Sequence, residues 1–99
     1  MDDVWIETRD STWVRADLIV DVSDSLWTTS AGSRGQYNFA KEGPGPGSGL
    51  ALLKTIKQAR TVARERESAV ILSWHGDKAG WRIETLDARE DRFRAERQL

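Results

Sequence analysis

The chain has 99 residues, a formal net charge of −1 and no cysteine, which fits one domain that buries its own core and excludes disulfides and thiolate metal sites. Its first residues are acidic and no apolar run approaches the length of about 18 residues that a membrane span needs. We therefore expect neither a signal peptide nor a membrane contact, and a cytoplasmic location.

Charge is distributed unevenly along the chain. Residues 1–24 carry seven acids against two bases, residues 25–67 carry seven bases against three acids, and the remainder balances at six each. Such asymmetry can orient a domain on a partner or let two copies meet head to tail, although solvated faces also fall this way by chance.

Residues 4–16 predict a hairpin that turns around Arg9, Asp10 and Ser11. A loop with an odd number of residues sorts the side chains best, because it places Val4, Ile6, Val14 and Ala16 together on one face. The other, more polar face then holds Trp5, Glu7, Trp13, Arg15 and Asp17.

Since tryptophan and arginine often carry binding energy, we predict a protein interface at Trp5, Trp13 and Arg15, with Arg15 able to lie over an indole. The alternative is that later strands or the terminal helix cover this face as core.

The next segments predict further strands. Residues 18–22 form a β-branched apolar run, which is either a continuation of the first hairpin after a bend or a separate buried strand. Residues 25–30 and 36–40 predict a second hairpin with residues 31–35 as its loop. We expect Trp27, Tyr37 and Phe39 on its apolar side.

Glycine and proline alternate over residues 43–49 and predict a flexible loop, without the Gly-Lys-Ser/Thr that a phosphate-binding loop requires. A helix over residues 49–66 follows, with Ser48 as its N-cap. Its apolar residues recur at helical spacing: Leu50, Leu52, Leu53, Ile56, Ala59 and Ala63. Beside this stripe lies a basic ridge of Lys54, Lys57, Arg60 and Arg64, which is either the solvated side of the helix or a surface that faces an anion.

Residues 69–75 and 81–86 predict a third hairpin around a loop at 77–80. Its apolar face should pack against the helix and consists of Val70, Leu72, Trp74, Trp81, Ile83 and Thr85. Residues 87–99 predict a charged helix that begins with a capping box of Asp87 and Glu90 and docks lightly through Phe93.

The sequence therefore predicts an α+β fold, a mostly antiparallel sheet in ββββ-α-ββ order with one long amphipathic helix packed on it and a short C-terminal helix. Residues 1–86 should form a single compact domain, and residues 87–99 a charged helix or tail. The only histidine, His75, is expected to face solvent at a strand end, and we predict no catalytic set, metal site or cofactor.

The expected function is that of a non-enzymatic protein-interaction module. It would use the exposed tryptophans of the first hairpin to bind a protein partner or a second copy of itself as a homo-oligomer. The alternative is an accessory nucleic-acid-binding domain that uses the basic ridge of the helix. The near-neutral charge favours the first expectation, since phosphate contacts normally leave a domain with a basic excess.

Overall fold

The computed structural model describes residues 3–30, 36–39, 45–76 and 79–97. The elements follow in the order β1 (Val4–Glu7), β2 (Trp13–Arg15), η1 (Ala16–Leu18), β3 (Ile19–Val22), β4 (Trp27–Ser30), β5 (Gln36–Asn38), α1 (Ser48–Arg66), β6 (Val70–Trp74), β7 (Trp81–Thr85) and α2 (Leu86–Arg97). This is an α+β fold with mostly antiparallel strands, as predicted. No helix in the described ranges is long and apolar enough to cross a membrane.

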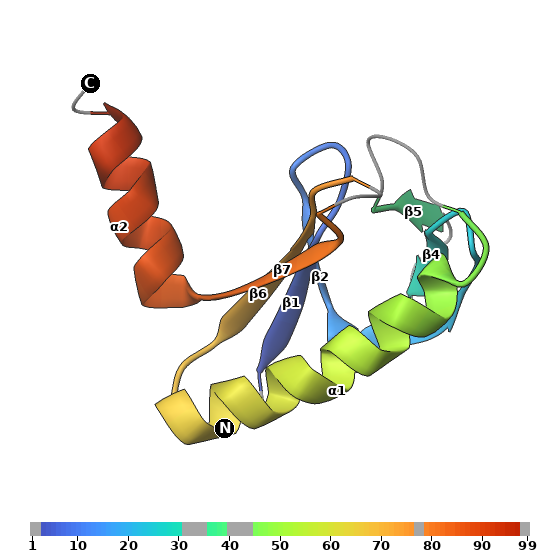
Figure 1. Cartoon of the computed structure of the whole chain (residues 1–99), viewed down its shortest axis with the longest axis horizontal. Helices are drawn as coiled ribbons and strands as arrows, with labels where there is room; N and C mark the ends of the chain where they lie inside the picture. Colours follow the sequence, from blue (N-terminus) through green and yellow to red (C-terminus); the bar gives the residue numbers. More distant parts are fainter. Residues whose placement is uncertain (1–2, 31–35, 40–44, 77–78, 98–99) are drawn as a thin grey trace.

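The strands divide into two sheets, whereas the sequence predicted one. Sheet A has the order β2-β1-β6-β7, and sheet B has the order β3-β4-β5. Five strands precede α1, because the short 3-10 helix η1 bends the chain and makes β3 a separate strand rather than a continuation of β2. Within sheet A, β1 and β6 pair in parallel. α1 covers one face of sheet A, and α2 projects away from the body at the end of β7 (Figure 1).

The first hairpin has the predicted odd loop, with Ile6 opposite Val14 and five residues, 8–12, between the strands. Its apolar face is buried against α1 through Val4, Ile6, Val14 and Ala16. On α1 the buried stripe comprises Leu52, Ile56, Ala59 and Ala63. The prediction that Leu50 and Leu53 belong to this stripe was wrong, since they are 58% and 53% exposed. The two leucines lie beside the narrow line along which a helix touches a sheet.

The start of α1 also differs from the prediction. Ser48 is the first residue of the helix rather than its N-cap, which is Gly47 with φ of 87°. The Ser48 hydroxyl instead accepts a hydrogen bond from the Gly45 N–H at 2.9 Å. Asp24, from the turn before β4, accepts the Gly49 N–H at 3.1 Å, so a remote carboxylate satisfies a donor of the first helical turn.

The third hairpin has the predicted register and apolar face. Leu72 lies opposite Ile83 and Trp74 opposite Trp81, and the two indoles meet edge to face with ring centroids 5.4 Å apart. Phe39 from the end of β5 contacts Trp81 in the same way at 6.2 Å, which joins sheet B to this part of the core. Of the predicted loop, residues 77–78 lie outside the described residues, and Gly80 has a φ of 67°.

Sheet B departs from the prediction in three respects. β3 is largely exposed rather than buried, with Val20 66% exposed. Trp27 does not share a face with Tyr37, because Trp27 pairs with Asn38 while Tyr37 pairs with the neighbouring Thr28. The buried residue of this segment is Leu26, fully inaccessible at a φ of 60°. The predicted hairpin loop, 31–35, lies outside the described residues, as do residues 43–44 of the Gly/Pro loop predicted at 43–49.

α2 begins at Leu86, one residue earlier than predicted. The Thr85 hydroxyl accepts the Ala88 N–H at 3.2 Å, so Thr85 caps the helix and Asp87 lies within its first turn. The prediction of a capping box with Asp87 at its start was therefore wrong. None of the residues of α2 is buried.

Candidate protein-interaction groove

The outer face of sheet A and one side of α2 enclose an open groove of about 850 Å³. We name it the tryptophan groove; its apolar lining comprises Trp5, Trp13, Ala69, Ile71, Leu86 and Phe93. Trp13 is 47% exposed and Phe93 54% exposed. Large apolar side chains gathered on one exposed surface are typical of a protein-interaction site.

The pairing of the strands explains how the floor of the groove is built. Trp5 in β1 lies opposite Arg15 in β2 and, on its other side, opposite Ile71 in β6. The Arg15 guanidinium carbon is 5.9 Å from the centre of the Trp5 ring, which is the predicted stacking. Trp5 is therefore half-buried between two neighbours, while Trp13 remains the more exposed indole.

The sequence left open whether the later strands or the terminal helix cover the face that carries Trp5 and Trp13. Among the residues that the structure describes, none from sheet B lines the tryptophan groove. α2 contributes Leu86, Arg89, Glu90 and Phe93 to one side of the groove. Along the floor, Ile71 is buried, Trp5 is half-buried and Trp13 is exposed.

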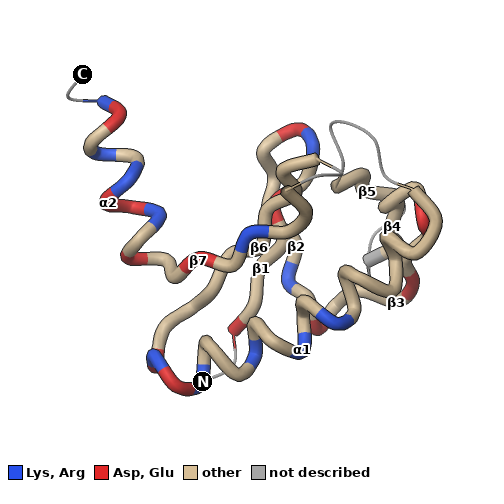
Figure 2. The backbone as a smooth tube through the Cα atoms, in the orientation of Figure 1, with Lys and Arg blue, Asp and Glu red and all other residues tan. Residues whose placement is uncertain are grey.

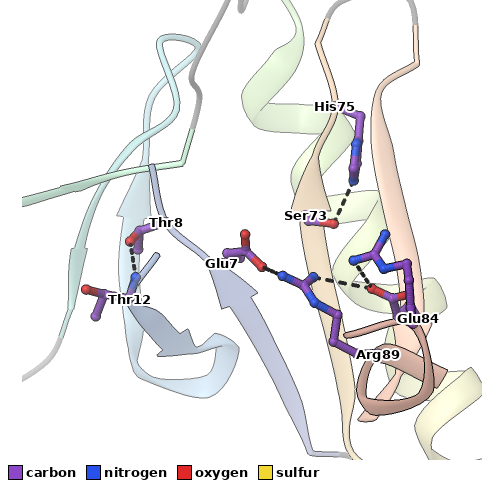
Figure 3. Close-up of polar contacts among 8 residues, drawn as sticks. Glu7, Thr8, Thr12, Ser73, His75, Glu84 and Arg89 are labelled. Atoms are coloured by element: carbon purple, nitrogen blue, oxygen red, sulfur yellow. Dashed lines mark hydrogen bonds and ion pairs between the residues drawn. The ribbon is translucent and has the colours of Figure 1, made fainter. Parts of the chain in front are cut away.

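Charged side chains fasten α2 at one end of the groove. The Arg89 guanidinium contacts Glu7 of β1 at 2.7 Å and Glu84 of β7 at 3.3 Å (Figure 3). Arg92 contacts the same Glu84 oxygen at 3.1 Å. The side chains of both glutamates are largely buried, with 16% and 11% exposed, so these contacts are less screened than ordinary surface ion pairs.

Beside this network lies a smaller polar pocket of about 210 Å³ that contains Ser73 and His75. The buried Ser73 hydroxyl and His75 Nε2 are 3.0 Å apart (Figure 3). Partial burial and the positive charges of Arg82 and Arg92 lower the pKa of His75. A neutral imidazole beside a hydroxyl is one element of a nucleophilic site, but the pair alone does not supply the orienting acid or the oxyanion donors of a catalytic triad. His75 is exposed, as predicted.

The basic ridge of α1 does not present a uniform surface. Lys54 and Lys57 are exposed to solvent, and Figure 2 shows the basic residues spaced along the helix. Arg60 and Arg64 instead line a depression of about 710 Å³ together with Arg15, Asp3 and Asp17. Two carboxylates of the chain itself therefore lie beside the C-terminal half of the ridge.

Ile71, Leu86 and Arg89 also belong to the site and were not predicted. Alternation along the third hairpin could have found Ile71, since it lies between Val70 and Leu72 and so faces away from α1. The parallel pairing that sets it beside Trp5 has no local signal, because β1 and β6 are far apart in the sequence.

No family model, no curated protein and no solved structure matches this chain. In the part of the chain that the structure describes, no cluster of three or more histidine, aspartate or glutamate side chains could hold a metal ion.

Proposed function

We propose that this protein is a non-enzymatic protein-interaction module and that the tryptophan groove is its binding surface. The observation that carries the proposal is the 47% exposure of Trp13 in a groove that is also lined by Leu86 and Phe93, which are 50% and 54% exposed. When a partner covers an exposed tryptophan, a large apolar area is removed from water, and the side chain loses little conformational entropy. Asp3, Arg89 and Glu90 line the same groove and supply polar groups beside this apolar centre.

A capture experiment from the native host, with the tagged chain as bait, tests this function. Trp13→Ser should release a partner that the wild-type chain retains. Trp27→Ser is the matched control, because Trp27 is 43% exposed but lies on sheet B outside the groove. The proposal fails if both variants retain the same proteins, including untagged copies of the chain, as the wild type does.

The alternative is nucleic-acid binding through the basic ridge. Exposed Lys54 and Lys57 favour it, whereas the position of Asp3 and Asp17 beside Arg60 and Arg64 weakens it, since those carboxylates repel phosphate. A salt-dependent gel shift that Lys57→Glu and Arg60→Glu abolish would favour this alternative over the interaction module.

A further inference from the structure

We propose that a proton controls the tryptophan groove: protonation of His75 releases α2 from sheet A and so removes one side of the groove. This inference rests on the proposed function, since it names how binding in the same groove is regulated. It is carried by the polar pocket beside the groove, where His75 lies together with the ion pairs that hold α2.

α2 is attached to the sheet through charge. None of its residues is buried. The Arg89 guanidinium contacts Glu7 at 2.7 Å and Glu84 at 3.3 Å, and Arg92 contacts Glu84 at 3.1 Å. The Leu86 N–H donates to the Ala69 carbonyl at 2.9 Å, so a released helix would pivot about its first residue. A helix of 12 residues is marginal by itself in water, and release should therefore also loosen its backbone hydrogen bonds.

His75 shares a pocket with both of these arginines. The lining of this pocket of about 210 Å³ includes His75, Glu7, Arg89 and Arg92. Glu7 and Arg89 line the tryptophan groove as well, so their ion pair belongs to both the pocket and the groove (Figure 3). A change of charge on His75 therefore acts on the contacts that position α2.

The charged side chains of the described residues that act on His75 come from β1, β7 and α2: Glu7, Arg82, Glu84 and Arg92. Partial burial of the imidazole and the two arginines oppose a proton on it, whereas the two glutamates favour one. Burial and the arginines prevail, which lowers the pKa of His75 from the ordinary 6.5. Asp77 and Lys78, which follow in the sequence, lie outside the described residues.

Release of α2 would reverse this balance. The departing helix takes Arg92 away, uncovers the side of the pocket that α2 lines, and leaves Glu7 and Glu84 without its arginines. All three changes favour a charged imidazole, so the pKa of His75 is higher with α2 released than with α2 docked. The state that binds the proton more tightly gains population as the pH falls, here by up to about tenfold per pH unit for one group.

The consequence for the groove follows from its lining. α2 contributes Leu86, Arg89, Glu90 and Phe93 to it, and sheet A contributes Trp5 and Trp13. A partner that contacts both sides would lose its contacts with the helix in acid. The groove should therefore hold its partner at neutral pH and release it as His75 takes up a proton.

An NMR titration of the full chain tests the coupling, because His75 is the only histidine of the sequence and its ring signals need no assignment. Arg89→Ala, which frees α2 from Glu7, should raise the pKa of His75. Arg94→Ala is the matched control, since it removes an arginine of α2 that contacts Glu90 on the same helix, and it should leave that pKa unchanged. Equal pKa values of His75 in Arg89→Ala and the wild type would overturn the proposal.

Amide hydrogen exchange along α2 measures the release itself. The data are compared as protection factors, which remove the intrinsic effect of pH on exchange. Protection of α2 in the wild type should fall between about pH 7.5 and about pH 5, the range in which histidine titrates, while protection of α1 stays constant. His75→Gln should abolish the fall. A flat profile in the wild type, or the same fall in His75→Gln or in α1, also overturns the proposal.

Both measurements use the chain without a partner, so they are independent of the capture experiment. If Trp13→Ser releases a captured protein while the protection of α2 does not change with pH, the proposed function stands and the control by a proton fails. If α2 responds to pH but Trp13→Ser and Trp27→Ser retain the same proteins as the wild type, control of binding in the groove is overturned together with the proposed function.

Discussion

Arg89 in α2 donates a hydrogen bond to Glu7 in β1 at 2.7 Å, across 82 residues of sequence. Because α2 buries no residue of its own, this contact and the two to Glu84 fix the position of the helix that walls the groove. The wall is thus held by charge rather than by apolar packing.

Arg89→Ala should loosen α2 and destabilise the protein by about 1–3 kcal/mol, because it removes the guanidinium that contacts the largely buried Glu7 and leaves Glu84 with its contact to Arg92. Amide hydrogen exchange along α2 and denaturant unfolding measure the two effects. Arg94→Ala is the control: it breaks only the exposed contact with Glu90, which should change stability by less than about 1 kcal/mol. Equal effects of the two substitutions would contradict the role assigned to Arg89.

The tryptophans should separate into two classes by stability. Trp74→Ala and Trp81→Ala should each reduce the free energy of unfolding by about 3–5 kcal/mol, since both indoles pack against the buried core. Trp13→Ala should cause a much smaller loss, because its side chain is 47% exposed. Thermal melts of the three variants decide this point; similar melting temperatures would make Trp13 a core residue.

Asp24→Ala should destabilise the start of α1 by about 0.5–2 kcal/mol, because it removes the acceptor of the Gly49 N–H. Asp24→Asn keeps a side-chain oxygen at that position and should retain most of the stability. Chemical denaturation of both variants measures the difference. If alanine and asparagine behaved alike, the hydrogen bond would have no share in the stability.

Stability should fall as the solution becomes acidic, in part through His75. Its pKa in the folded protein is lowered from the ordinary 6.5, chiefly by partial burial, so at pH values below that the unfolded chain binds more protons than the folded one. The stability that depends on a neutral His75 is fully present above about pH 6.5. It is lost as the pH falls towards the lowered pKa of His75 in the folded protein. His75→Gln should show a shallower fall in the denaturation midpoint over this range, and an unchanged slope would contradict the assignment.

Local patterns predicted those parts of the fold that depend on local periodicity. The registers of the first and third hairpins follow from alternation, because a shift by one residue would expose Ile6 or Leu72. The division into two sheets and the β1–β6 pairing depend on contacts between distant segments, which no window of sequence contains. Leu26 was missed because its left-handed backbone breaks the alternation that should mark a buried strand residue.

The same limit applies to the tryptophan groove. Trp5, Trp13 and Arg15 share the predicted face, because the hairpin alone places them there. Ile71, Leu86 and Phe93 join them only once β6 lies beside β1 and α2 follows β7. The sequence therefore predicted half of the surface and could not predict the wall that makes it a groove.

The parallel pairing of β1 with β6 has a consequence for the order of folding. Val4 meets Val70 in this ladder, so one edge of β1 stays unpaired until most of the chain has left the ribosome. Contacts of such sequence separation close slowly, and exposed strand edges invite pairing with other chains. A nascent chain that ends after α1 would present this open edge next to Val4 and Ile6, apolar residues that the finished protein buries. Synthesis of the last third of the chain is therefore the step that protects the first strand from aggregation.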